Sequence, residues 1–193
     1  MANDLGQVRW GGISMNLSDA QRDVRTTFLG GFAGQLASSL IWFLSAALAT
    51  WVSTSSAIVV LVVGGVFIFP LTQLLLRFMG RPASLGSGHP MNQLAMQVAF
   101  TLPLNLPLVA AATACRLTWF YPAFMIVLGT HYLPFMFLYG MWQFGALAAV
   151  LWGAGIGLGL YGPPVFSLGG WFTAIALLVF AFVGRRIVLR EVK

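Results

Sequence analysis

Long apolar segments alternate with short polar ones along most of the chain. Three runs contain no Asp, Glu, Lys or Arg: 51 residues between Arg25 and Arg77, 34 between Arg81 and Arg116, and 68 between Arg116 and Arg185. Because a membrane-spanning helix takes about 20 apolar residues, the runs predict two, one and three spans. The expected spans are residues 27–50, 55–76, 91–113, 117–139, 141–161 and 165–184.

The residues before the first span divide into two parts. Residues 1–16 contain Gly, Asn and Ser without periodicity, which predicts a flexible N-terminal tail. From Leu17 onward, apolar side chains at Leu17, Ala20, Val24 and Phe28 share one helical face. This pattern is typical of a short interfacial helix that leads into the membrane. Residues 17–193 are therefore expected to form a single membrane domain.

The third expected span carries polar side chains at every fourth position. These are His89, Gln93, Gln97, Thr101 and Asn105. At 3.6 residues per turn, a four-residue step drifts by about 40°, so the side chains form a slowly winding ridge. Pro103 and Pro107 free backbone carbonyls in the same stretch. Since lipid cannot satisfy such groups, this span is expected to face the inside of the bundle, with the other spans packed around it.

Polar groups of other spans are expected at a similar depth. With a rise of 1.5 Å per residue, Gln35, Gln97 and His131 lie roughly 9–12 Å from the same end of their spans. Thr101 lies slightly deeper, and Tyr132 is next to His131. These residues predict either a solute-binding site or hydrogen bonds between neighbouring helices. His89, at the mouth of the third span, is a candidate gate or a loop histidine that contacts water or headgroups.

Composition supports a membrane protein and excludes several other classes. Of the 193 residues, 59% are hydrophobic and 7% are charged, whereas soluble domains carry about 25% charged residues. The net charge is +6, but the basic residues are not clustered on a soluble face, so no nucleic acid is expected as a partner. With a cytoplasmic N-terminus, six spans place nine of the ten cations inside and only Arg116 outside. The positive-inside rule therefore predicts that both termini are cytoplasmic.

The sequence offers little chemistry. No Asp, Glu or Lys lies within an expected span, although such groups usually mark proton relays and ion pathways. Cys115 is the only cysteine, so neither a disulfide nor a cysteine metal cluster is expected. No metalloprotease, hydrolase or phosphate-binding motif occurs. We expect no metal or cofactor, and an enzyme is disfavoured.

Three stretches carry a resemblance. The run Gln21-Arg22-Asp23-Val24-Arg25, the pair Gly30-Gly31 and the loop Gly88-His89-Pro90-Met91-Asn92 resemble a family of small bacterial multi-pass membrane proteins. The resemblance extends from Leu17 onward. It implies a location in the bacterial inner membrane, and it supplies no activity because none is assigned to that family.

Three functional hypotheses remain at this point. The first is an all-α, six-helix bundle that binds or passes a small neutral or weakly charged solute, with the third span lining the route. The second is an accessory or scaffold protein that packs against a partner or forms a homo-oligomer in the bilayer. Its signal is a small-residue ladder, typical of close helix packing: Gly145, Ala149, Gly153 and Gly157. The third is an intramembrane enzyme or redox subunit.

Overall fold

The computed structural model describes residues 7–10 and 13–191 of the chain. Its first elements are two strands, β1 (Gln7–Trp10) and β2 (Ile13–Asn16), which pair in antiparallel register with Val8 opposite Met15. The structure thus places two short strands in the expected flexible tail, while residues 1–6 and 11–12 lie outside the described residues. The hairpin leads directly into α1 (Leu17–Thr27), which has buried residues on one face, Ala20 and Val24.

Within the described residues, six helices are long and apolar enough to cross a membrane. Each expected span overlaps one of them. They are α2 (Phe32–Trp51), α3 (Thr54–Phe78), α4 (Met91–Cys115), α5 (Phe120–Tyr139), α6 (Gln143–Tyr161) and α7 (Leu168–Glu191). Short 3₁₀ turns precede two of these helices: η1 (Leu29–Gly31) before α2, and η2 (Leu117–Trp119) before α5.

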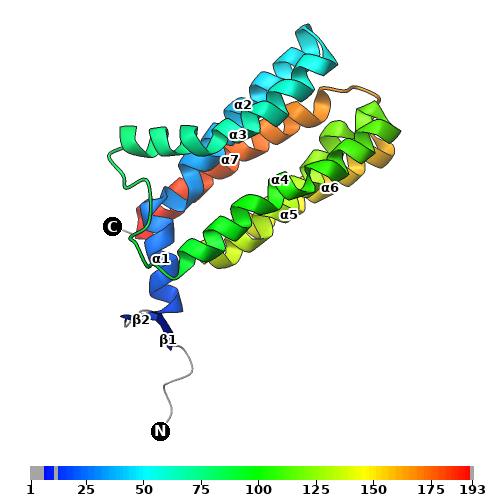
Figure 1. Ribbon diagram of the computed structural model, residues 1–193. Helices are drawn as coiled ribbons and strands as arrows, with labels where there is room; N and C mark the ends of the chain where they lie inside the picture. Colours follow the sequence, from blue (N-terminus) through cyan, green and yellow to red (C-terminus); the bar gives the residue numbers. More distant parts are fainter. Residues whose placement is uncertain (1–6, 11–12, 192–193) are drawn as a thin grey trace.

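The six helices form two groups of three (Figure 1). In one group α2 packs against α3 and α7, and in the other α5 packs against α4 and α6. The chain order η1–α2–α3–α4 is repeated as η2–α5–α6–α7, with α2 and α5 both 20 residues long. Successive helices alternate in direction, so the second set of three runs opposite to the first. In each set, the third helix packs against the first helix of the other set.

The position of α4 corrects one expectation. The third span was expected inside the bundle, but α4 lies at its edge and packs mainly against α5. Its buried residues are Met91, Val98 and Val109, whereas α5 contributes ten buried residues and forms the centre. The physical reason is that apolar side chains of α4 form most of the contact with α5. The polar ridge winds around α4, so only the C-terminal end of the ridge reaches that contact.

Buried contacts join the two groups where the C-terminal half of α2 meets the first turns of α3 and α5. The Ser45 hydroxyl of α2 donates to the Ala57 carbonyl of α3 (2.9 Å) and lies 2.6 Å from the Tyr121 hydroxyl of α5. The Trp42 ring packs against the Tyr121 and Phe124 rings, with centroids 5.8 and 5.2 Å apart. These contacts bury polar and aromatic groups together, so they fix how α2 meets α5.

A backbone break separates α1 from α2. Leu29, Gly30 and Gly31 all have positive φ, of 50°, 63° and 79°. Gly30 also packs closely on α7, because a Cβ there would lie 2.9 Å from the Gly184 carbonyl oxygen. An ion pair of 2.7 Å between Arg25 and Glu191 then holds α1 across this end of the bundle.

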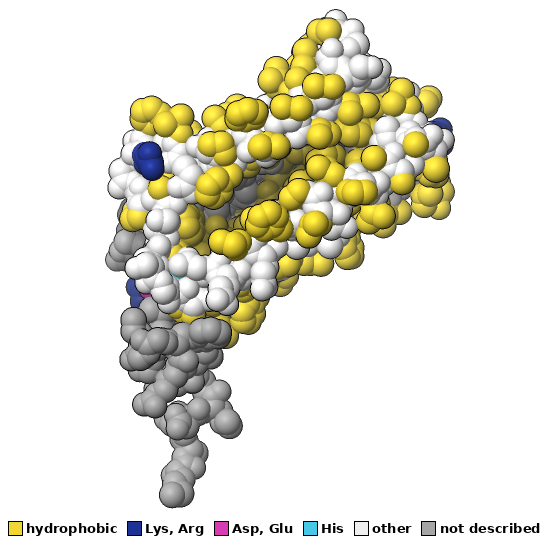
Figure 2. Space-filling view, viewed as in Figure 1, with side chains coloured by type: hydrophobic (Ala, Val, Ile, Leu, Met, Phe, Trp, Pro, Cys, Tyr) yellow, Lys and Arg dark blue, Asp and Glu magenta, His cyan; other side chains and the backbone are white. Residues whose placement is uncertain are grey.

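The surface is apolar along the helices. In Figure 2, hydrophobic side chains cover both groups, and the charged side chains visible in this view lie near the helix ends. Trp51, Trp142 and Tyr161, at or next to helix ends, are 72%, 72% and 87% exposed, as expected for aromatic anchors at membrane interfaces. The face in Figure 2 is hollowed between the two groups, where α3 and α4 are barely in contact.

Candidate functional site

A threonine–histidine pair joins α4 to α5. Thr101 Oγ1 lies 2.9 Å from His131 Nδ1, and the same hydroxyl donates to the Val98 carbonyl at 2.7 Å. A hydroxyl has one hydrogen, so Thr101 accepts the second bond and His131 Nδ1–H donates it. In a neutral imidazole the lone pair then lies on Nε2, which makes no hydrogen bond within the described part of the chain. The pair can therefore accept one further hydrogen bond from a donor.

Aromatic rings surround one side of this pair. The His131 ring packs against Tyr132 and Phe135, with centroids 5.7 and 5.1 Å apart. Tyr132 is buried and stacks on Phe144 of α6 at 6.1 Å. The rings fix the imidazole plane, so the direction of Nε2 is set before any ligand arrives.

The other residues of the polar ridge divide between two environments. Asn105 Nδ2 donates to the Thr101 carbonyl at 2.7 Å, which places its amide one turn from the pair. Gln93 and Gln97 are exposed and make no hydrogen bond to the described residues. The structure thus brings together Thr101, His131 and Tyr132, and it leaves the two glutamines on the surface of α4.

Two buried glutamines lie elsewhere in the bundle. Gln35 of α2 is 3% exposed and Gln143 of α6 is 1% exposed, and neither amide finds a hydrogen-bond partner among the described residues. A Cβ added to Gly184 would collide with Gln143 Nε2 and would approach the Gly30 carbonyl oxygen at 2.8 Å. Gln35, expected beside Thr101 and His131, makes no hydrogen bond to them. Gln143 was not predicted as a buried residue, because it follows Trp142 at the start of a helix, a position typical of the membrane interface.

His89 caps α4. Its Nδ1 accepts the backbone N–H of Met91 at 3.2 Å, and its Nε2 lies 3.8 Å from Asp23 Oδ2 of α1. The His89 side chain is 8% exposed. These contacts hold the start of α4 against α1, and the role of His89 as a gate stays a prediction.

Comparison with known proteins places the chain in a family. Residues 17–186 match a family of unknown function, DUF7010. The chain belongs to the DUF7010 family. The match runs from the start of α1 into the last turns of α7 and excludes the hairpin β1–β2. No curated protein and no solved structure matches this DUF7010 chain. The family description agrees with the resemblance to a family without an assigned activity.

The small-residue ladder of the DUF7010 chain is only partly used inside the subunit. A Cβ on Gly145 would collide with the Met136 sulfur of α5, so this glycine serves internal packing. Gly153 and Gly157 have open space where a Cβ would stand, and Ala149 is exposed. The outer part of the ladder is therefore free to face lipid or another helix.

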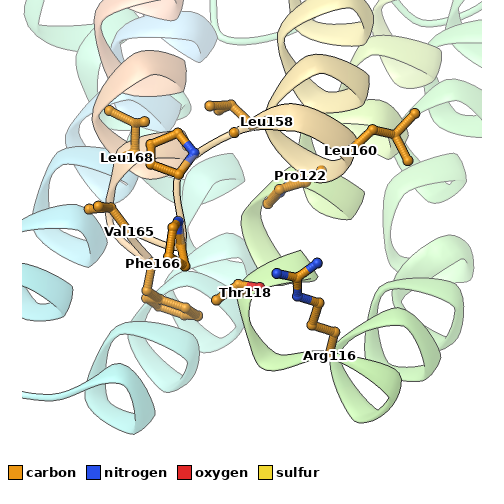
Figure 3. A pocket seen from close by; sticks show the side chains of 13 residues that line it. Arg116, Thr118, Pro122, Leu158, Leu160, Val165, Phe166 and Leu168 are labelled. Carbon is orange, nitrogen blue, oxygen red and sulfur yellow. The ribbon is translucent and has the colours of Figure 1, made fainter.

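A small pocket lies at the opposite end of the DUF7010 bundle from α1. It has a volume of about 70 Å³ and is formed by η2, the start of α5 and the connection between α6 and α7. Figure 3 shows the Arg116 guanidinium turned toward this pocket beside Thr118. Trp119 Nε1 donates to the Gly159 carbonyl at 3.0 Å and ties η2 to α6. From the sequence, Arg116 was noted only as the one cation expected on the non-cytoplasmic side. The pocket could not be predicted, because it is completed by the α6–α7 connection, which begins 46 residues later at Gly162.

The described residues show no cluster of side chains suited to binding a metal ion. They contain no group of three or more His, Cys, Asp or Glu side chains that could hold a metal ion. Cys115 is exposed at the end of α4, away from both histidines in sequence. What the described site offers is hydrogen bonding, through the His131 imidazole, the Thr101 hydroxyl and the Asn105 amide one turn away.

Proposed function

We propose that this DUF7010 protein is a multi-pass protein of the bacterial inner membrane with both termini in the cytoplasm. In this proposal it binds or passes a small neutral or weakly charged solute within its helix bundle, beside the contact between α4 and α5. The cation distribution supports the orientation. The six apolar helices and the exposed aromatic anchors at their ends support the location.

The observation that carries the solute hypothesis is the oriented His131 imidazole. Its Nδ1 is bonded to Thr101, and its Nε2 is left to accept a hydrogen bond. Polar side chains at helix contacts in membrane bundles commonly hydrogen-bond to the neighbouring helix. An unused acceptor held in place by rings matches a solute that carries a hydroxyl or amide donor.

The arrangement of the helices supports the same hypothesis. Many secondary transporters are built from two repeats of opposite topology and bind their substrate between them. The order η1–α2–α3–α4 and its inverted counterpart η2–α5–α6–α7 have this form. This likeness is one of fold alone, and the chemistry is supplied by the site itself.

Exposed amides on α4 point to water beside that helix. Gln93 and Gln97 lie on a helix that otherwise exposes large apolar side chains such as Phe100 and Leu104. An amide without a partner costs several kcal/mol in hydrocarbon, about 4–8 for transfer to cyclohexane. A wet space in the hollow between α3 and α4 would remove that cost for side chains that reach it (Figure 2).

The experiment is solute entry into proteoliposomes, followed by light scattering after an osmotic step of glycerol or urea. The test variant is Thr101→Val, which keeps the shape and removes the acceptor for His131. Thr113→Val is the matched control, since the Thr113 hydroxyl donates only to the Val109 carbonyl of its own helix at 2.7 Å. Loss of one hydrogen bond of about 1.4 kcal/mol in the path should slow entry roughly tenfold.

Three outcomes matter. Faster entry than in protein-free vesicles, slowed by Thr101→Val and by Gln97→Leu but not by Thr113→Val, supports the proposal. Equal rates for the wild type and Thr101→Val contradict the role of the pair. Entry of both solutes at the protein-free rate contradicts passage, and binding would then have to show as glycerol- or urea-dependent quenching of the bundle's tryptophans.

A second candidate is a homo-oligomer or scaffold that packs through the outer ladder. The open space at Gly153 and Gly157 and the exposure of Ala149 favour it, because small residues at four-residue steps let two backbones approach. Gly153→Leu should then lower the yield of cross-linked dimer in vesicles, whereas Gly65→Leu, which also has open space but lies on α3, should not. A cross-linking yield unchanged by Gly153→Leu contradicts this candidate.

A further inference from the structure

A second, apolar groove continues from the pocket at Arg116. It has a volume of about 310 Å³ and is lined by Ala154, Gly157 and Leu158 of α6 and by Leu168 and Phe172 of α7. Leu158 and Leu168 also line the Arg116 pocket, so the two spaces adjoin. The groove leads from the ends of α6 and α7 toward the middle of the bundle, because Ala154 and Phe172 lie one to two turns inside Tyr161 and Leu168.

The two spaces differ in chemistry. Polar groups dominate the surface of the pocket at the helix ends, and apolar side chains alone form the surface of the groove along the helices. Leu168 and Phe172 remain 37% and 40% exposed, so the groove opens sideways toward lipid. A ligand that fills both spaces must be charged or polar at one end and a hydrocarbon chain at the other.

Arg116 indicates that the polar end of the ligand is negatively charged. Its side chain forms no ion pair or hydrogen bond with any residue that the structure describes. Thr118, beside it in Figure 3, offers a hydroxyl that no described group uses. A guanidinium binds phosphate through two parallel N–H bonds, and a neighbouring hydroxyl can supply a third.

We propose that the pocket and groove together bind one anionic phospholipid of the non-cytoplasmic leaflet. The phosphate lies at Arg116 and Thr118, and one acyl chain lies in the groove between α6 and α7. Charge complementarity selects the headgroup, since the other cations of the chain fall on the opposite side of the membrane in the proposed orientation. The absence of a side chain at Gly157 makes room for the chain.

The test is native mass spectrometry of the full chain released from nanodiscs of phosphatidylcholine with a small fraction of phosphatidylglycerol. The wild type should retain a single phosphatidylglycerol in preference to phosphatidylcholine. Arg116→Gln should lose this preference, and Gly157→Leu, which fills the groove, should lose the retained lipid of either kind. Arg81→Gln, on the α3–α4 connection, and Gly65→Leu, on α3, are the matched controls and should behave like the wild type.

Several results would overturn the proposal. Equal retention of the two lipids by the wild type removes the charge selection, and retention unchanged in Gly157→Leu removes the groove. An arm with inorganic phosphate distinguishes the sources of the anion. Displacement of the lipid by millimolar phosphate would show that the pocket takes a free anion. None of these readouts depends on solute flux, so they stand or fall separately from the proposed function.

Discussion

Replacing Gln143 by Met should stabilise the folded bundle. The side chain is 1% exposed, and neither Nε2 nor Oε1 has a partner among the described residues. A buried polar group without a partner costs about 1–3 kcal/mol of desolvation. Methionine has the same unbranched length and no polar group, so it fills the space beside Gly184 without that cost.

The position of Gln143 sets the size of the effect. It is the first residue of α6, next to the exposed Trp142. In the proposed membrane location, this end of α6 reaches headgroups and water when the helices separate, so the amide regains its hydrogen bonds in the separated state. The full cost therefore falls on the packed state, and we expect the free energy of unfolding to rise by about 1–3 kcal/mol.

The measurement is reversible unfolding in mixed micelles, followed by the fluorescence of the tryptophans, of which Trp42 is buried. Gln93→Met is the control, because Gln93 is exposed and its substitution should change the free energy by less than about 0.5 kcal/mol. A loss of 1 kcal/mol or more in Gln143→Met, on the order of a lost hydrogen bond, would refute the reasoning, since it would mean that the folded protein satisfies the amide.

Two further predictions concern contacts between helices. A double-mutant cycle of Ser45→Ala and Tyr121→Phe should give a coupling of about 0.6 kcal/mol, and at most about 1.7, in the same unfolding assay, because the two hydroxyls lie 2.6 Å apart in the interior; a coupling of zero would contradict a bond between the two groups. Gly184→Ala should cost about 1–3 kcal/mol of stability, since its Cβ would meet the backbone of Gly30 and the Gln143 amide. Gly153→Ala, with open space around it, should instead gain up to about 1 kcal/mol of helix propensity, and equal effects of the two glycine substitutions would contradict the packing.

The helices could be anticipated because the signals that specify them are local. A run without charges, about 20 residues long, predicts a helix in lipid wherever it occurs. The break at Arg116 falls between two expected spans, whereas the break at Gly30 and Gly31 was not predicted, because the expected span 27–50 runs through it. The pair of strands β1 and β2 was missed although Val8 and Trp10, and Ile13 and Met15, alternate with polar residues. Each run has only four residues, the shortest length at which alternation indicates a strand.

The arrangement of the helices could not be anticipated in the same way. The recurrence of polar residues in the third span places Thr101 and Asn105 on one ridge, yet it cannot say which neighbour that ridge meets. The structure places the Thr101 and His131 side chains in contact, whereas Gln35 lies apart because α2 packs with α3 and α7. Gln143 packs against Gly184, and Arg116 lies beside the α6–α7 connection. Contacts between residues so far apart in the chain produce no sequence pattern that could predict them.

The packing of α7 against α2 has a consequence for biosynthesis. The Ser39 hydroxyl of α2 donates to the Ala174 carbonyl of α7 at 2.8 Å, across 135 residues of chain. During translation α2 leaves the ribosome long before α7 exists. In the proposed membrane location, Ser39 is therefore in the translocon or in lipid without its partner until α7 has been made. A ribosome stalled within α6 would leave that face of α2 uncovered, and a membrane quality-control protease would have a distinct feature by which to recognise the unfinished chain.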